Sequence, residues 1–130
     1  MKLKFHDNLS FINSAQFFAP LTNKQRSKIA SIVIPHYYES KSKVFESGSR
    51  ALSMFVVKSG KLKKSIRGHS FQILRKGDIC EELAVLTENA HHRETLIAIT
   101  KLELLSFKSE TVQKVLGAGF PLIICRNMAR

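Results

Sequence analysis

The stretch Met54-Phe55-Val56-Val57-Lys58-Ser59-Gly60-Lys61-Leu62 decides the fold class of this chain. Its first four residues form a short uninterrupted apolar run, which is typical of a buried β-strand. Ser59-Gly60 is a turn signal. The segment from Leu62 to Ile66 is therefore predicted to be the second strand of a β-hairpin.

The region between Tyr37 and Phe107 continues this pattern of short apolar runs separated by turn residues. Further strands are predicted around 71–73, 96–99 and 102–106. Many short strands with regular turn signals indicate a β-roll or jelly roll. One segment, 81–86, is too polar at its start for a core strand, and it is predicted to form one or two helical turns.

Helical patterns flank the strands on both sides. Thr22 and Gln25 have the spacing of a capping box at a helix start, and Pro35 is expected to end that helix. The chain is predicted to be a single α+β domain over residues 1–130. Its parts are N-terminal helices at 1–35, an antiparallel β-roll at 36–108, and C-terminal helices at 109–130 that we expect to be truncated.

Charge and cysteine usage narrow the class of protein. The 130 residues carry a formal net charge of +11, with 21 Lys and Arg against 10 Asp and Glu. Such a balance fits nucleic acid, an anionic membrane or an acidic protein as partner. Cys80 and Cys125 form no CxxC pair, so we expect reduced thiols. Without a membrane-length apolar run or a signal peptide, a cytoplasmic location is expected.

A cluster of lysines suggests a second way to interpret the basic charge. Lys58, Lys61, Lys63, Lys64 and Arg67 fall on the predicted hairpin. Lysines on an exposed edge hairpin discourage strand-to-strand aggregation, and the alternative is a docking surface for an acidic partner or polyanion. Few exposed aromatic residues interleave with them, so base-stacking recognition of single-stranded nucleic acid is not indicated, and nucleic acid is not the expected partner.

The order of helices, short strands, a short helix, strands and helices resembles the cyclic-nucleotide-binding domain family. Four stretches carry the resemblance: Phe17-Phe18-x-x-Leu21-Thr22-x-x-Gln25, Phe45-x-x-Gly48 with Met54 to Leu62, Gly77-Asp78-Ile79-Cys80-Glu81-Glu82-Leu83-Ala84-Val85-Leu86, and His92-Arg93-Glu94-Thr95-Leu96-Ile97-Ala98. The closing segments 115–117 and 122–127 look most like the regulatory part of protozoan-type cGMP-dependent protein kinases.

The resemblance implies a phosphate-binding cassette at residues 77–98. In the family, a Glu accepts a hydrogen bond from the ribose hydroxyl, and backbone N–H groups at a short helix start face the phosphate. Glu82 falls on the ribose-binding position, and Leu83 and Ala84 fall on the amide donors. Thr95 fixes the register of the second half.

Two cassette positions depart from the family pattern. His92 stands at the position of the phosphate-binding Arg, and a neutral His is a weaker partner for phosphate. Arg93 comes one residue later, on the opposite face of an extended strand unless a bulge turns it inward. Glu81 stands at the family's Gly, where it adds a side chain and a negative charge beside an anion.

These observations predict a regulatory domain with a degenerate cassette and weak or no binding of cGMP or cAMP. The expected partners are tandem regulatory domains and a kinase domain of the same protein. A working cGMP or cAMP switch and a basic β-roll that docks a polyanion or protein remain as alternatives. No catalytic residue is predicted. His91, His92 and Glu94 do not have the spacing of a metal site.

Overall fold

The computed structural model describes residues 2–45, 53–66, 70–80, 95–108 and 114. The helical elements come first: α1 (Lys2–Ser14), the 3-10 turn η1 (Gln16–Phe18) and α2 (Asn23–Ile32). The strands described after them are β1 (Ile34–Tyr38), β2 (Lys43–Phe45), β3 (Ser53–Ser59), β4 (Leu62–Ile66), β5 (Ser70–Leu74), β6 (Ile79–Cys80), β7 (Thr95–Ala98) and β8 (Leu102–Lys108).

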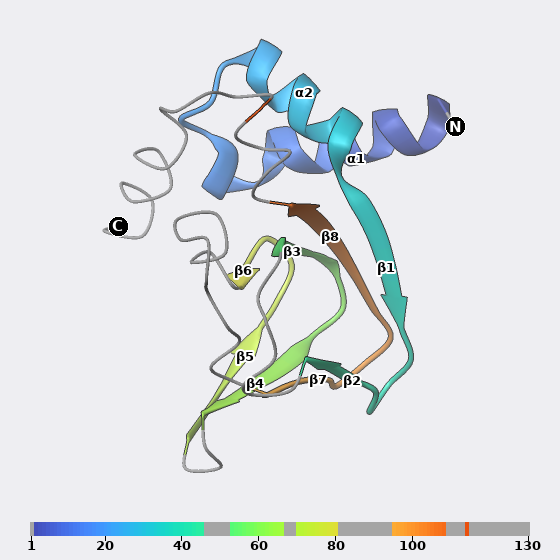
Figure 1. Cartoon of the computed structure of the whole chain (residues 1–130), viewed down its shortest axis with the longest axis vertical. Helices are drawn as coiled ribbons and strands as arrows, with labels where there is room; N and C mark the ends of the chain where they lie inside the picture. Colours follow the sequence, from blue (N-terminus) through green and yellow to red (C-terminus); the bar gives the residue numbers. More distant parts are fainter. Residues whose placement is uncertain (1, 46–52, 67–69, 81–94, 109–113, 115–130) are drawn as a thin grey trace.

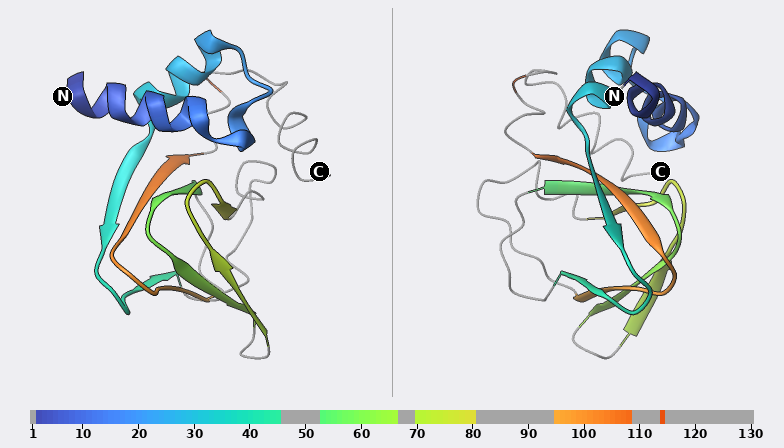
Figure 2. Two further views of the ribbon diagram at one scale, coloured as in Figure 1. Left: turned by 180° about the vertical axis from the view of Figure 1, so that it is seen from behind. Right: turned by 90° about the vertical axis from the view of Figure 1, so that its right-hand side faces the viewer.

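The strands form two antiparallel sheets that face each other. Sheet A has the order β1-β8-β3-β6, and sheet B has the order β2-β7-β4-β5. The two members of each pair β1 and β2, β3 and β4, β5 and β6, and β7 and β8 occupy matching positions in the two sheets. The roll is therefore built from four long strands, each bent once where it passes from one sheet to the other, and the sheets open away from this corner (Figure 2).

The corner explains where the backbone takes positive φ angles. Among the described residues these are Lys41 (φ 72), Gly60 (φ 90) and Gly77 (φ 91), and each lies between two strands of different sheets. Neighbouring bends are joined by backbone hydrogen bonds. The N–H of Lys41 donates to the carbonyl of Ala98 at 2.7 Å, and the N–H of Ile99 donates to that of Lys61 at 2.9 Å.

The predicted hairpin between 54–57 and 62–66 is wrong. β3 pairs with β8 and β6, whereas β4 pairs with β5 and β7. The turn signal at Gly60 is real, but the chain bends there into the other sheet instead of returning along β3. A Cβ atom at Gly60 would overlap the carbonyl oxygen of Lys101, so this bend packs tightly against the bend between β7 and β8.

The start of α2 is as predicted, and its end is not. The Thr22 hydroxyl accepts from the N–H of Gln25 at 3.1 Å, and the Gln25 side chain accepts from the N–H of Thr22 at 2.9 Å. The helix ends at Ile32 and not at Pro35. Pro35 instead lies inside β1 and pairs with Leu105. A proline is tolerated there because β1 is an edge strand, which needs no second set of hydrogen bonds.

Two hydrophobic clusters hold these layers together. The first lies between the helices and the face of sheet A that points away from sheet B (Figure 1), and its fully buried members include Ile12, Phe18 and Ile29. The second lies between the two sheets and includes Val57 and Leu96. Within the described part of the chain, no helix is both long and apolar enough to span a membrane.

The other predicted helices lie outside the described residues. These are the short helix at 81–86 and the C-terminal helices at 109–130, of which the structure describes Lys114 alone.

Candidate functional site

Two short strands lead into and out of the predicted cassette. β6 ends at Cys80 and pairs with β3 through Val56↔Ile79 and Phe55↔Cys80. β7 begins at Thr95 and lies between β2 and β4. The chain therefore leaves sheet A at one end of segment 81–94 and rejoins sheet B at the other. Both ends of the segment are fixed by strands on facing sheets.

The turn before β6 sets the direction in which the chain enters the cassette. The N–H of Arg75 donates to the Asp78 carboxylate at 2.8 Å, and the N–H of Asp78 donates to the Arg75 carbonyl at 2.9 Å. The N–H of Gly77 donates to the Val57 carbonyl at 2.8 Å, and the N–H of Val57 donates to the Asp78 carbonyl at 2.9 Å. These bonds attach the turn firmly to β3.

Most of the predicted site residues lie outside the described residues: Glu81, Glu82, Leu83, Ala84, His92 and Arg93. Thr95 is described. It is partly buried and pairs with Ser65 of β4. The next residue, Leu96, is fully buried between the sheets. Because side chains alternate along a strand, Thr95 points to the other face of sheet B. Its placement fits a residue that sets the register of β7.

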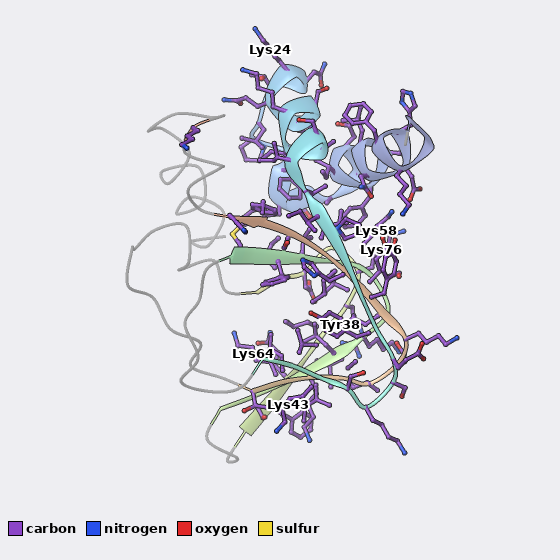
Figure 3. The ribbon with its side chains drawn as sticks, turned by 45° about the vertical axis from the view of Figure 1, so that its right-hand side comes forward. Lys24, Tyr38, Lys43, Lys58, Lys64 and Lys76 are labelled. Atoms are coloured by element: carbon purple, nitrogen blue, oxygen red, sulfur yellow. The ribbon has the colours of Figure 1, made fainter. Side chains whose placement is uncertain are left out.

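Lys64 lies on the inner face of the roll, which the sequence analysis did not anticipate. It pairs with Leu96 on one side and Gln72 on the other, and it is two residues after the buried Leu62. Alternation therefore directs Lys64 toward sheet A (Figure 3). The signal was present in the sequence, since Leu62 and Lys64 are spaced i and i+2. The neighbouring lysines hide this spacing, because together with Lys64 they form a continuous basic cluster in the sequence.

The inner face of sheet A carries a polar pair of its own. A hydrogen bond of 2.8 Å joins His36 Nε2 to the hydroxyl of Ser106, a residue that is 3% exposed. The His36 ring also lies 5.7 Å from the ring of Phe55. Burial lowers the pKa of His36 below its ordinary value. The imidazole is therefore neutral at neutral pH, and it supplies the partner that the buried Ser106 hydroxyl requires.

Lys58 belongs to a different part of the molecule from the other lysines of the predicted cluster. Its ammonium donates to the side chains of Asp7 and, at 2.8 Å, Asn8 of α1, and it lies 3.5 Å from the Glu103 carboxylate of β8. Burial lowers the pKa of Lys58, but Asp7 and Glu103 outweigh this effect and raise it above its ordinary value. Lys58 therefore attaches α1 to sheet A and does not contribute to an exposed basic patch.

A groove runs along α1 beside this ion group. Its two adjoining parts have volumes of about 230 and 370 Å³, and Phe11, Ser14 and Lys76 line both. The groove lies on the outside of the roll, between α1 and the turn at 75–78, and not between the sheets. Among the described residues, no three His, Cys, Asp or Glu side chains are grouped to hold a metal ion.

The arrangement of two sheets, a corner and a cassette-length segment between β6 and β7 matches a known domain. The family model described as "Cyclic nucleotide-binding domain" matches residues 35–118, from the start of β1 to beyond β8. This chain belongs to the cyclic nucleotide-binding domain family. The match includes all the described strands and the whole of segment 81–94.

Relatives of this cyclic nucleotide-binding domain include protein kinases. A cGMP-dependent protein kinase of Toxoplasma gondii is 30% identical over 124 residues, which are 95% of this chain and 12% of the kinase. The chain therefore spans only a small part of that relative's length. The predicted resemblance to the family, and to protozoan cGMP-dependent kinases within it, is confirmed.

Solved structures confirm the predicted fold class. The cAMP-bound structure PfPKA-R has a TM-score of 0.86 at 18% identity and covers 98% of this chain and 45% of its own. The regulatory subunit of a cAMP-independent protein kinase A from Trypanosoma brucei has a TM-score of 0.83 at 16% identity, covering 98% and 46%. At these identities the likeness establishes the antiparallel β-roll of the domain.

Proposed function

We propose that this chain is a regulatory domain, of the type found in cGMP-dependent protein kinases, whose nucleotide pocket is degenerate. The proposal rests on a contrast between the strands that hold segment 81–94 and the residues within that segment. β6, β7 and the turn at 75–78 hold both ends of segment 81–94 on facing sheets. Within that segment, Glu81 and His92 stand where the family has its Gly and its phosphate-binding Arg.

The two departures act in the same direction on affinity. Loss of a charge-assisted hydrogen bond to a buried phosphate costs about 1.5–3 kcal/mol. At about 1.4 kcal/mol per factor of ten, this is roughly a ten- to hundred-fold loss of affinity. Glu81 adds a side chain and a negative charge where a backbone should approach an anion. Weak or absent binding of cGMP and cAMP follows.

In this proposal the domain acts within a longer cytoplasmic protein. It would contact tandem regulatory domains and a kinase domain of the same chain, and the predicted helices at 109–130 would carry those contacts. The Trypanosoma brucei structure, whose protein is described as cAMP-independent, shows that the same fold occurs in a kinase regulatory subunit described in that way.

A working nucleotide switch is the second candidate, and Lys64 favours it. The side chain of Lys64 lies on the inner face of sheet B. Lys64 pairs with Leu96, the second residue after segment 81–94. A cation inside the roll supplies a charge that can partner the phosphate of a cyclic nucleotide in place of an arginine at position 92. In this case Glu82 would still bind the ribose.

The test is isothermal titration calorimetry of the purified chain with cGMP and then cAMP. For the wild type we expect no binding heat up to about 1 mM ligand, which corresponds to a binding free energy weaker than about −4 kcal/mol. The double variant Glu81→Gly/His92→Arg should gain at least about tenfold in affinity, because it restores the family's residue at both positions. Circular dichroism of each sample shows that it is folded.

The variants also separate the two candidates. Micromolar binding by the wild type, abolished by Glu82→Ala, would overturn the degenerate pocket. If Lys64→Gln then weakens that binding at least tenfold, the working switch with a substituted phosphate partner is supported. Lys63→Gln is the matched control, because its side chain lies on the opposite face of the same strand.

A further inference from the structure

The outer face of sheet B, which points away from sheet A, is a surface distinct from the nucleotide pocket. α1 and α2 pack on sheet A, and none of the described helices covers sheet B (Figure 1). Of the three lysines in β2, β4, β5 and β7, Lys43 and Lys63 point outward and Lys64 points inward, and these strands contain no Asp or Glu. The outer face therefore carries the positive charge of Lys43 and Lys63.

Cations and aliphatic residues alternate across this face. The strand register places Lys43 of β2 beside Ile97 of β7, Ile97 beside Lys63 of β4, and Lys63 beside Ile73 of β5. This row crosses all four strands of the sheet. It lies on the outer face, because its members alternate along their strands with Leu62, Leu74, Leu96 and Ala98, which are buried between the sheets.

Exposed apolar side chains extend the row on both sides. Phe71 of β5 is 65% exposed, and the Lys63 ammonium lies 4.8 Å from the centre of its ring. On the other side, Ile99 directly follows β7, is 40% exposed, and donates its N–H to the carbonyl of Lys61. Figure 3 shows Lys43 directed away from the space between the sheets, while Lys24 of α2 lies at the far end of the molecule.

We propose that the outer face of sheet B binds an acidic protein segment in which apolar residues alternate with Asp or Glu. An extended segment presents alternate side chains to one surface. Its carboxylates would meet the lysines, and its apolar residues would cover Ile97, Ile73 and Phe71. A bare polyanion would satisfy the lysines alone and leave the apolar residues in contact with water.

The shape of the face favours a peptide over a lipid surface. Membrane-surface binding requires apolar side chains that enter the acyl boundary. Here Ile73 and Ile97 are partly buried in the sheet, and the ring of Phe71 lies beneath the Lys63 ammonium. With strands about 4.8 Å apart and about 3.3 Å per residue, the face measures only about 300 Å². Such an area suits a short segment and weak, transient binding.

The experiment uses the full chain and a fluorescein-labelled peptide of about six residues in which Glu and Val alternate, matched to the extent of the face. Fluorescence anisotropy should give a dissociation constant of about 10–100 μM at low salt, typical of a small interface. Lys43→Glu/Lys63→Glu should weaken binding at least tenfold, because both lysines lie in the row. The matched control Lys24→Glu/Lys28→Glu makes the same change in net charge on α2 and should alter it less than twofold.

Two further arms decide the chemistry of the partner. Phe71→Ser leaves every charge in place and should weaken binding of the Glu–Val peptide about threefold or more, while a Glu–Ser peptide should bind weakly to all variants. The Phe71 variant also serves if the double reversal does not fold, since Phe71 is exposed. The proposal would be overturned if the α2 control lost as much affinity for the peptide as the double variant. It would also be overturned if heparin or phosphatidylserine vesicles bound more tightly than the peptide and Phe71→Ser did not weaken that binding.

Discussion

The two sheets of the roll have four strands each but bury their side chains differently. In sheet A, four consecutive residues of β3 are buried. Met54 and Val56 pack toward the helices, and Phe55 and Val57 pack toward sheet B. In sheet B, Leu62 of β4 is buried while the next residue, Lys63, is exposed.

The difference comes from the helical layer. α1, η1 and α2 cover one face of sheet A, so both of its faces are apolar, and its central strands appear in the sequence as continuous apolar runs. Sheet B has one buried face, so its strands alternate. The same alternation placed Lys64 inside the roll and Lys63 outside it. The burial pattern of a central strand therefore shows which of these two sheets it joins.

The largest effect is expected at the corner that joins the two sheets. Gly60→Ala should destabilise the chain by about 3–5 kcal/mol, because it combines positive-φ strain with overlap of backbone atoms. The overlap is with the Lys101 carbonyl oxygen and with Leu102 Cα, which would lie 3.0 Å from the new Cβ. Urea unfolding followed by circular dichroism measures this loss.

Gly77→Ala is the matched control for the corner. Its φ of +91 equals that of Gly60 within a degree, but a Cβ atom there meets nothing within 4 Å. It should cost only the conformational strain, about 1–2 kcal/mol. Equal losses for the two variants would mean that φ alone, and not the packing of the bends, governs the corner.

A smaller effect should distinguish the covered from the uncovered sheet. Leu105 of β8 is fully buried against the helices, and Leu105→Ala should cost about 2–5 kcal/mol. β7 occupies the second position of sheet B, as β8 does in sheet A, but the side chain of Ile97 in β7 faces outward. Ile97→Ala should cost less than about 1 kcal/mol. Denaturant midpoints of both variants test the comparison, which fails if Ile97 proves as costly as Leu105.

The pH dependence of stability should report on the inner face of sheet A. Burial lowers the pKa of His36, so the folded state disfavours its protonated form. This contribution is fully present above about pH 6.5 and is lost as the pH falls through the lower folded pKa. Unfolding midpoints should therefore fall on acidification below pH 6.5. The decline should be shallower in His36→Gln, and an equally steep decline in that variant would contradict the prediction.

The smallest effect should be a gain at the first bend. Lys41 has a φ of 72, in the left-handed region that costs a residue with a side chain about 1 kcal/mol or more. Lys41→Gly should raise stability by up to about 1 kcal/mol, partly offset by the greater freedom of glycine when unfolded. A loss in thermal unfolding would show that the Lys41 side chain contributes more than the strain it carries.

Local signals predicted some features accurately. The capping box of Thr22 and Gln25 needs only residues three apart, and it forms as expected. The run at 54–57 is a buried strand because four consecutive apolar residues suit a sheet covered on both faces. Pro35 was less informative, since its restriction on the preceding residue is equally compatible with a helix end and an edge strand.

Features that depend on distant partners were not predictable in this way. Gly60 indicates a backbone with positive φ, but a return turn and a bend between sheets both use that conformation. Pairing with distant strands decides between the two: β3 pairs with β8 and β4 pairs with β7, both of which come about forty residues later. For the same reason Lys58, next to the other lysines in sequence, lies in an ion group with Asp7 and Glu103.

The sequence by itself determined the family, the helix start at Thr22 and the buried strand, and it predicts that Glu81 and His92 are the two unusual residues of the cassette. These depend on residue type and on short spacings along the chain. Only the tertiary structure decided that the strands bend at one corner, that Lys64 faces inward, and that the outer face of sheet B is basic and uncovered by the described helices. Those features follow from pairing between strands far apart in sequence, because a strand's register decides which face each side chain occupies.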